Sequence, residues 1–285
     1  ILPGWMSDAE IAEFRTRCKE LSGPMPWLVL KLDSIKVKDR LSRLIDLVDG
    51  VFISRKELAL STSPALVPML TKEIIEFCIL RSKTVITASD MLASMRHKPS
   101  PTRAEISDIA NSVYDGSDAV VLSEDIFLGD YYHQALQTMD RAIIDAEEGS
   151  IQEINWIRKK PEIKSEYDAI SYAAFQSAEL LNAKAFVCLT EAGKTAISLA
   201  SFRPKIPIIA VTFKKHVTDN LALVRGVDCL FFENSLNFDE VLPKVNAFLK
   251  QESWLKTGDR IIFVSVTLSS IAQKASNLFT VQRIQ

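Results

Sequence analysis

Short apolar runs rich in β-branched residues alternate with amphipathic segments along most of the chain. In the first half, the apolar runs cover residues 1–6, 27–33, 48–54, 83–89 and 117–123. This alternation favours β/α units around a mostly parallel sheet, because a helix between two strands returns the chain to the sheet in the same direction. Five such units predict either an open sheet or part of a (β/α)8 barrel.

Helix-start signals occur between these runs. Ser7 followed by Glu10 forms a capping box at the head of residues 7–21, which carry Ile11, Phe14 and Cys18 on one face. Two further amphipathic segments, residues 63–82 and 103–116, repeat the pattern. We therefore expect α-helices in all three segments.

A polar passage around residues 145–168 has little periodicity and reads as a linker. We predict a first domain over residues 1–150, a connector over 151–166 and a second α/β domain over 167–285. Strand-like runs in the second domain cover residues 184–190, 206–212, 227–233 and 259–267, with a last run near the C-terminus. Two α/β domains are thus expected.

Composition excludes several classes of protein. The chain has 285 residues, of which 47% are hydrophobic, and a formal net charge of -2. This apolar fraction is sufficient for two buried cores, whereas the charge offers no basic surface for nucleic acid. No run approaches the ~18 continuous apolar residues of a membrane span. We expect a soluble globular protein without nucleic-acid or membrane partners.

The four cysteines are far apart in the sequence: Cys18, Cys78, Cys188 and Cys229. Such spacing matches neither a zinc site nor a disulfide framework, so we predict buried free thiols and an intracellular, reducing compartment, either cytosol or organelle matrix. The abrupt apolar start at Ile1 further predicts that preceding sequence, or another chain, completes the first domain.

Several motifs, in one order and at one spacing, resemble those of the pyruvate kinase family. They are "KLDS" (31–34), "SRKELA" (54–59), "VITASDMLASM" (85–95), "PSPTRAEISDIANSVYDG" (99–116), "VLSEDIFLGDYY" (121–132) and "LTEAGKTAISLASFRPKIPIIAVT" (189–212). The resemblance implies a partial TIM-type (β/α)8 barrel followed by a pyruvate-kinase-type C-terminal α/β domain. It covers only the C-terminal part of a typical member, since residues 1–6 align with the fourth barrel strand.

The family transfers a phosphoryl group between phosphoenolpyruvate and ADP with Mg²⁺ and K⁺, so the resemblance assigns roles to specific residues. Lys31 matches the family's catalytic lysine, and Ser89 stands where the family has a threonine. Asp33 and Glu57 align with the family's two metal-binding carboxylates. Asp33 stands where the family has a glutamate, and Glu57 stands where it has an aspartate. Arg55, together with Lys56 and Glu57, matches the substrate-binding segment.

Other positions depart from the family pattern. Lys56 replaces a glycine where backbone amides approach the substrate, and Asp90 replaces a glutamine beside an anion site. Glu124 and Asp125 replace a Gly-Glu pair in the next turn. The absent N-terminal strands would also have supplied the K⁺ ligands. These changes predict weakened catalysis.

In the second domain, the effector-phosphate loop keeps four residues of the family pattern: Thr190, Gly193, Lys194 and Thr195. Glu191 and Ala192 depart from it, and the effector loop nearer the C-terminus, residues 266–277, has no glycine. Because a backbone phosphate cradle needs glycine at its tight turns, we expect no sugar-bisphosphate regulation. The spacing of "TEAGKT" also differs from that of a P-loop.

Two functions remain open at this stage. The chain is either a pyruvate kinase homologue with impaired or no catalysis, retained as a structural subunit of a larger assembly, or the C-terminal portion of an active, divergent pyruvate kinase. In the first case its partners are other subunits or a front half that completes the barrel. In the second case they are phosphoenolpyruvate and ADP, with Mg²⁺ and K⁺ as cofactors.

Overall fold

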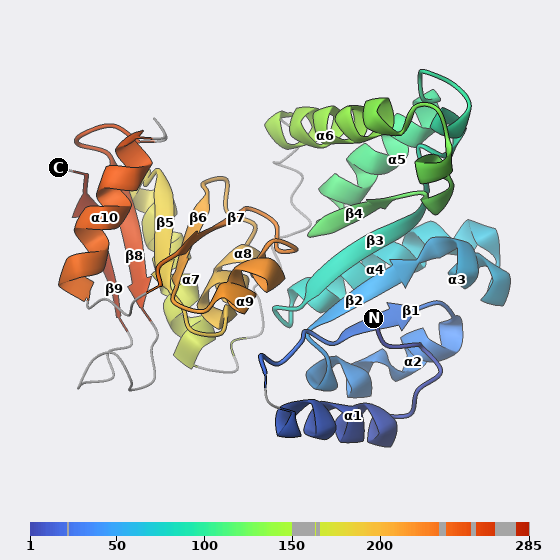
Figure 1. Ribbon diagram of the computed structural model, residues 1–285, viewed down its shortest axis with the longest axis horizontal. Coiled ribbons are helices and arrows are strands. Elements are labelled where there is room, and N and C mark those ends of the chain that lie inside the picture. Colours follow the sequence, from blue (N-terminus) through green and yellow to red (C-terminus); the bar gives the residue numbers. More distant parts are fainter. Residues whose placement is uncertain are drawn as a thin grey trace. The chain divides into compact units, whose positions relative to one another are not determined.

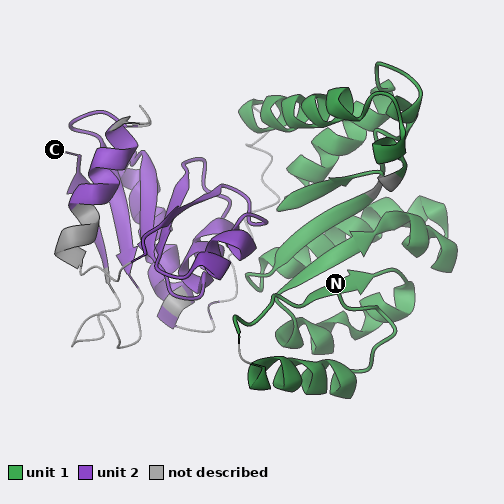
Figure 2. Ribbon diagram, viewed as in Figure 1, with its two compact units in different colours: residues 1–160 green, residues 161–285 purple. Residues whose placement is uncertain are grey.

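Parallel strands of apolar residues form the centre of both parts of the molecule (Figure 1). The computed structural model describes residues 1–21, 23–149, 163, 166–233, 238–251, 255–265 and 278–284. The chain divides into two compact units, residues 1–160 and 161–285 (Figure 2). Apart from Ile163 and Glu166, the predicted connector lies outside the described residues.

Unit 1 contains a sheet in the order β1-β2-β3-β4. The strands are β1 (Val29–Leu32), β2 (Gly50–Ser54), β3 (Thr84–Met91) and β4 (Ala119–Leu122). All neighbouring pairs are parallel, and each strand lies beside the strand that follows it in the sequence. Such an order is that of a barrel wall, whereas an open doubly wound sheet reverses its order at a switch point. The structure thus favours the barrel alternative for unit 1.

The predicted strand at residues 1–6 is wrong in extent, because only one residue of it pairs. Leu2 forms an isolated parallel bridge with Leu30. The Leu2 amide donates to the Val29 carbonyl at 2.7 Å, and the Lys31 amide donates to the Leu2 carbonyl at 2.9 Å. Pro3, which has no N–H group, follows, and its carbonyl accepts from the Met6 amide at 3.2 Å, which turns the chain away. Four predicted strands therefore form, and the fifth contributes one bridge.

Unit 1 contains six α-helices among its described residues, and α1, α4 and α5 lie in the three segments predicted to be helical. They are α1 (Asp8–Glu20), α2 (Ile35–Leu44), α3 (Arg55–Ser61), α4 (Val67–Ile79), α5 (Arg103–Tyr114) and α6 (Tyr132–Glu148). The Ser7–Glu10 capping box is present at α1, and a second one, Thr102–Glu105, begins α5. In each box two otherwise unpaired backbone amides at the helix start find a partner.

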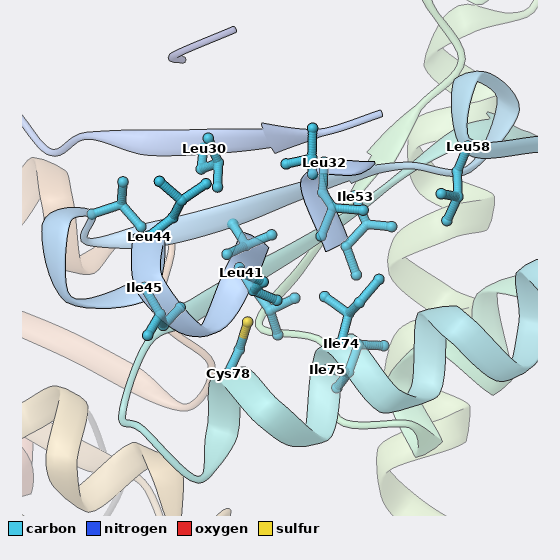
Figure 3. Packing of buried hydrophobic residues seen from close by; sticks show 14 of the residues in the cluster. Leu30, Leu32, Leu41, Leu44, Ile45, Ile53, Leu58, Ile74, Ile75 and Cys78 are labelled. Carbon is cyan, nitrogen blue, oxygen red and sulfur yellow. The ribbon is translucent and has the colours of Figure 1, made fainter. Parts of the chain in front are cut away.

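The largest core cluster of unit 1 lies between the sheet and the helices (Figure 3). Leu30, Leu32 and Ile53 reach it from β1 and β2, and all three are fully buried. Side chains of α2 and α4 close the other side, among them Leu41, Leu44, Ile74, Ile75 and Cys78. Full burial of one such aliphatic side chain contributes roughly 1.5–3 kcal/mol, so this packing fixes the strands that carry the candidate site.

Aspartates at the starts of two strands fix the strand ends opposite the candidate site. Asp49, just before β2, accepts a hydrogen bond from the Leu28 amide at 2.8 Å, and Asp118, just before β4, accepts one from the Val85 amide at 2.9 Å. Each carboxylate thereby ties its strand to the start of the preceding one. Arg15 of α1 donates to Asp49 at 2.7 Å and anchors the first helix there.

Unit 2 contains a sheet in the order β7-β6-β5-β8-β9, in which β9 alone is antiparallel. The strands are β5 (Ala185–Leu189), β6 (Ile208–Thr212), β7 (Val227–Phe231), β8 (Arg260–Ser265) and β9 (Leu278–Arg283). The described helices are α7 (Glu166–Leu181), α8 (Lys194–Ser201), α9 (Lys215–Leu221) and α10 (Phe238–Gln251). The order reverses between β5 and β8, which makes unit 2 a doubly wound α/β domain.

All four cysteines are free, but only Cys78 and Cys188 are buried. Cys18 and Cys229 are partly exposed, so the prediction of buried thiols holds for two of the four. Within the described part of the chain, no helix combines the length and the hydropathy needed to cross a membrane.

Candidate functional site

The carboxyl ends of β1 and β2 bring together two of the residues that the sequence singles out. Lys31 lies in β1, and Glu57 lies in the first turn of α3, directly after β2. Because β1 and β2 are parallel neighbours, side chains that follow them meet at one edge of the sheet. The position of Glu57 depends on α3 beginning at once after Ser54, with no intervening loop.

Lys31 and Glu57 form a close ion pair. The Lys31 Nζ lies 2.7 Å from Oε1 and 2.6 Å from Oε2 of Glu57, and both side chains are about one-third to two-fifths exposed, at 32% and 43%. The hydrogen bond from Lys31 lowers the pKa of Glu57, partial burial opposes this, and a hydrogen bond with the Ser54 side chain adds to the lowering. Glu57 is therefore held as a carboxylate against the lysine.

Asp33, the other predicted metal ligand, follows β1 and is partly buried. It is close to Gly4: a Cβ at Gly4 would lie 2.7 Å from Asp33 Oδ1 and 2.7 Å from the Lys31 carbonyl oxygen. In the part of the chain that is described, no hydrogen bond joins Asp33 to Lys31 or Glu57. Asp33 and Glu57 thus follow adjacent strands, but only Glu57 contacts the lysine.

These residues fit a divalent cation poorly. Mg²⁺ takes oxygen ligands in near-octahedral geometry at about 2.0–2.1 Å, whereas both oxygens of Glu57 face the Lys31 ammonium. Among the described residues, no group of three or more histidine, cysteine, aspartate or glutamate side chains is arranged to hold a metal ion. Of the two Glu57 oxygens beside the lysine, Oε2 is buried and accepts no hydrogen bond from the described residues.

Arg55 is tied to a residue to which the sequence assigned no role. Its Nη1 lies 2.5 Å from Asp108 Oδ1 and its Nη2 lies 2.7 Å from Asp108 Oδ2, while its Nε donates to the Ala88 carbonyl at 3.2 Å. Asp108 lies in α5, 53 positions further along the chain. A separation of this length gives no local sequence signal, and only the fold brings the pair together.

Lys56 and the end of β3 complete this edge of unit 1. Lys56 lies in α3 with its side chain exposed. Ser89 lies in β3, but its side chain is outside the described set. The register of β3 shifts between Thr87 and Met91, and Asp90 there has a positive φ of 57°. A left-handed non-glycine residue costs roughly 1 kcal/mol, so the strand end is locally strained.

Glu105 is a second residue whose structural role exceeds what the sequence indicated. Besides its capping bonds to Thr102, it accepts from the Ser94 amide at 2.7 Å and from the Ser94 hydroxyl at 2.6 Å. Partial burial raises the pKa of Glu105, but the bonds from Ser94 and Thr102 outweigh it and leave the pKa lowered. The "PTRAE" stretch therefore joins α5 to the turn after β3.

In unit 2, the predicted effector-phosphate loop lies between β5 and α8, at the reversal of strand order. Thr190 and Thr195 are buried and Lys194 is exposed. Gly193 has a φ of 82°, and its amide donates to the Thr190 hydroxyl at 2.9 Å. An amide that a phosphate would use is thus already bonded within the loop. The second effector loop, residues 266–277, lies outside the described residues.

Glu191 adds negative charge to the same loop. Its Oε2 lies 3.5 Å from Lys214 Nζ, so part of the local positive charge is neutralised internally. A pocket of about 590 Å³ lies at the opposite, amino-terminal edge of this sheet, lined by Lys184, Pro207, Asp228, Leu255, Lys256 and Asp259. The pocket contains none of the residues that the sequence singled out.

Comparison with known proteins agrees with this architecture. Residues 7–136 match the family description "Pyruvate kinase, barrel domain", and residues 168–281 match "Pyruvate kinase, alpha/beta domain". The pyruvate kinase of Clostridium perfringens is 32% identical over 283 residues, which cover 96% of this chain and 58% of the relative. That of Sporosarcina psychrophila is 31% identical over 258 residues, with 90% and 44% covered.

Solved structures give the same result. A crystal structure of a pyruvate kinase from Cryptosporidium parvum matches with a TM-score of 0.89 at 28% identity, covering 98% of this chain and 57% of the other. A Cryptosporidium parvum pyruvate kinase in complex with ADP matches with a TM-score of 0.86. The chain spans about half the length of these relatives. With both halves of its sequence matched, this chain belongs to the pyruvate kinase family.

Proposed function

We propose that this chain is the back part of a pyruvate-kinase-type barrel with its C-terminal domain, that it has little or no phosphoryl transfer of its own, and that it acts as a structural subunit of a larger assembly. One observation carries the proposal: Lys31 and Glu57, to which the family resemblance assigns the phosphoryl group and the metal, are paired with each other at 2.7 Å.

The outer edge of β4 suits a structural role. In the described part of the chain, β4 pairs with β3 on one side and with no strand on the other. Apolar side chains of the turn before α6 and of α6 itself are exposed: Phe127 at 67%, Leu128 at 79% and Leu136 at 56%. An open strand edge beside exposed apolar side chains is a typical binding surface for further protein.

One observation favours a second function, in which the site is still catalytic. Lys31 and Glu57 still meet at the carboxyl ends of adjacent strands, which is where barrel enzymes place catalytic groups. The alternative is therefore the C-terminal portion of an active, divergent pyruvate kinase that binds phosphoenolpyruvate and ADP. On this alternative a front barrel segment would complete the site, and Mg²⁺ and K⁺ would be needed.

An activity assay separates the two functions. The purified 285-residue chain, alone and mixed with the front barrel segment of a relative, is given phosphoenolpyruvate, ADP, Mg²⁺ and K⁺. We expect no ATP formation above a protein-free blank in either sample. Turnover at roughly 1 to 1,000 per second, lost in Lys31→Met, would overturn the proposal in favour of the alternative.

The structural role has its own test. We expect the front barrel segment to form a one-to-one complex with the chain, measured by light scattering after gel filtration. The Asp118 amide points toward β3, so strand alternation directs the Val121 amide to the open edge. Val121→Pro removes that donor and should weaken the complex, whereas Val281→Pro on β9 of unit 2 should leave it unchanged. Absence of any complex with the unmodified chain contradicts the structural role.

A further inference from the structure

Lys31 and Glu57 are each other's nearest opposite charge at the ends of β1 and β2. The ammonium lies within 2.7 Å of both carboxylate oxygens, so each oxygen has the lysine as a neighbour. Glu57 is one methylene longer than the aspartate of the family pattern, and in this chain it contacts the lysine of β1.

The charges carried by the ends of β1 and β2, counted without Asp90 of β3, are balanced. Lys31 and Lys56 supply two cations, and Asp33 and Glu57 supply two carboxylates. Arg55 and Asp108 are paired with each other at 2.5 and 2.7 Å and add no net charge. A site for a divalent cation normally carries an excess of carboxylates over cations. These six residues provide no such excess.

The position of Asp33 gives a second, independent obstacle. Its Oδ1 is packed against Gly4, where even a single added carbon would lie only 2.7 Å away. The same added carbon would lie 2.8 Å from Val37 Cγ2. Asp33 Oδ1 thus lies beside Gly4, and in the described part of the chain no hydrogen bond joins it to Glu57.

We infer that Glu57 is the resident partner of Lys31, and that this internal ion pair occupies the place of the divalent cation that the family resemblance implies. This inference rests on the proposed function and gives it a physical cause. The lysine charge that would meet a phosphate is neutralised within the chain, and the carboxylate that would meet a metal is bonded to the lysine. The two opposite charges therefore offset each other within the chain.

Binding of Mn²⁺ alone, followed by the loss of the free-ion signal in electron paramagnetic resonance, tests the inference without an activity assay. We expect the unmodified chain to show only weak, unsaturated binding. Lys31→Met leaves the Glu57 carboxylate without its cation and should raise the Mn²⁺ affinity by at least about tenfold. Lys56→Met, which removes an exposed lysine of the same charge, is the matched control and should raise it far less.

Three outcomes would overturn the inference: saturable Mn²⁺ binding by the unmodified chain with the affinity of Lys31→Met, an equal gain in Lys31→Met and Lys56→Met, or no gain in Lys31→Met. Circular dichroism and thermal unfolding check that the variants are folded, and Lys31→Gln, which keeps a polar side chain of similar length, replaces Lys31→Met if the latter does not fold. Metal binding without ATP formation would refute this inference alone. ATP formation refutes the proposed function.

Discussion

Arg55 and Asp108 join two of the six motifs by which the chain resembles its family, through two parallel hydrogen bonds of 2.5 and 2.7 Å. Arg55 begins α3 beside the candidate site, and Asp108 lies within α5. A guanidinium fork that is saturated by a carboxylate is a strong and directional contact. We therefore assign Arg55 to positioning α3, and with it Glu57.

Replacement of Arg55 by lysine should test this role. Lys cannot form the two parallel bonds to Asp108, so Arg55→Lys should lower the free energy of unfolding by about 1–2 kcal/mol at this partly buried pair. The matched control is Arg17→Lys in the exposed Arg17–Glu13 pair, which should change it by less than about 0.5 kcal/mol. Urea unfolding of both variants measures the difference. Equal losses of stability in the two variants would show that the paired hydrogen bonds of Arg55 stabilise the fold no more than an exposed ion pair does.

Glu105 should make the stability of unit 1 sensitive to acid. Its pKa is lowered in the folded chain, so its hydrogen bonds contribute fully above the ordinary value of 4.5 and are lost as the pH falls through the lower folded value. Glu105→Gln should therefore lower stability at pH 7 by about 1–3 kcal/mol, with the difference from the unmodified chain shrinking below pH 4.5.

The capping box of α1 provides the control for Glu105. Glu10 has the same local bonds to Ser7 but lacks any equivalent of the two bonds from Ser94. Glu10→Gln should thus cost less than Glu105→Gln at neutral pH. If both substitutions have the same effect in urea titrations between pH 7 and pH 3, the contact with Ser94 has no energetic weight.

Gly4 should not tolerate a side chain. Gly4→Ala would place a methyl group 2.7 Å from Asp33 Oδ1 and from the Lys31 carbonyl oxygen, and overpacking of this kind costs typically about 1–3 kcal/mol. Gly149→Ala, where the nearest atom would be 3.4 Å away, is the matched control and should be nearly neutral. Thermal unfolding compares the two. A neutral Gly4→Ala would mean that the segment before α1 shifts freely, contrary to its contacts.

The partly buried Lys83 should make the free energy of unfolding increase as the pH rises toward 10.5. Burial lowers the pKa of Lys83, which donates to the Val48 carbonyl at 2.7 Å, and nearby Asp49 and Asp46 only partly offset this. The unfolded chain then holds its proton up to about 10.5, while the folded chain releases it earlier, so stability rises with pH in that window. The unmodified chain should therefore gain stability relative to Lys83→Met on approaching pH 10.5. A constant difference between the two in urea unfolding would contradict this.

Much of the fold could be predicted because its signals are local. The apolar runs mark the strands from β1 to β8. The start of α1 is marked by two residues only three positions apart, Ser7 and Glu10. The run at residues 1–6 was misjudged because a Pro at position 3 permits only the Leu2 bridge. Periodicity cannot distinguish a full strand from a single bridge next to a proline.

The candidate site was less accessible from the sequence. The resemblance assigned Lys31 and Glu57 to one site, but the distance between their charged groups depends on where α3 begins. The bond between Arg55 and Asp108 joins residues 53 positions apart and has no sequence signature. Pairings of this kind arise only once the sheet has brought distant helices together.

The two strand orders also imply different folding behaviour. In unit 1 each strand pairs with its successor, so every β/α unit can fold onto the preceding one as the chain lengthens. In unit 2, β5 also pairs with β8, as Ala185 does with Ile261, although β6 and β7 lie between them in the sequence. This pairing can form only after β8 is present. Because distant pairings carry a larger loop-closure entropy, we expect unit 2 to have the higher contact order and the slower refolding phase.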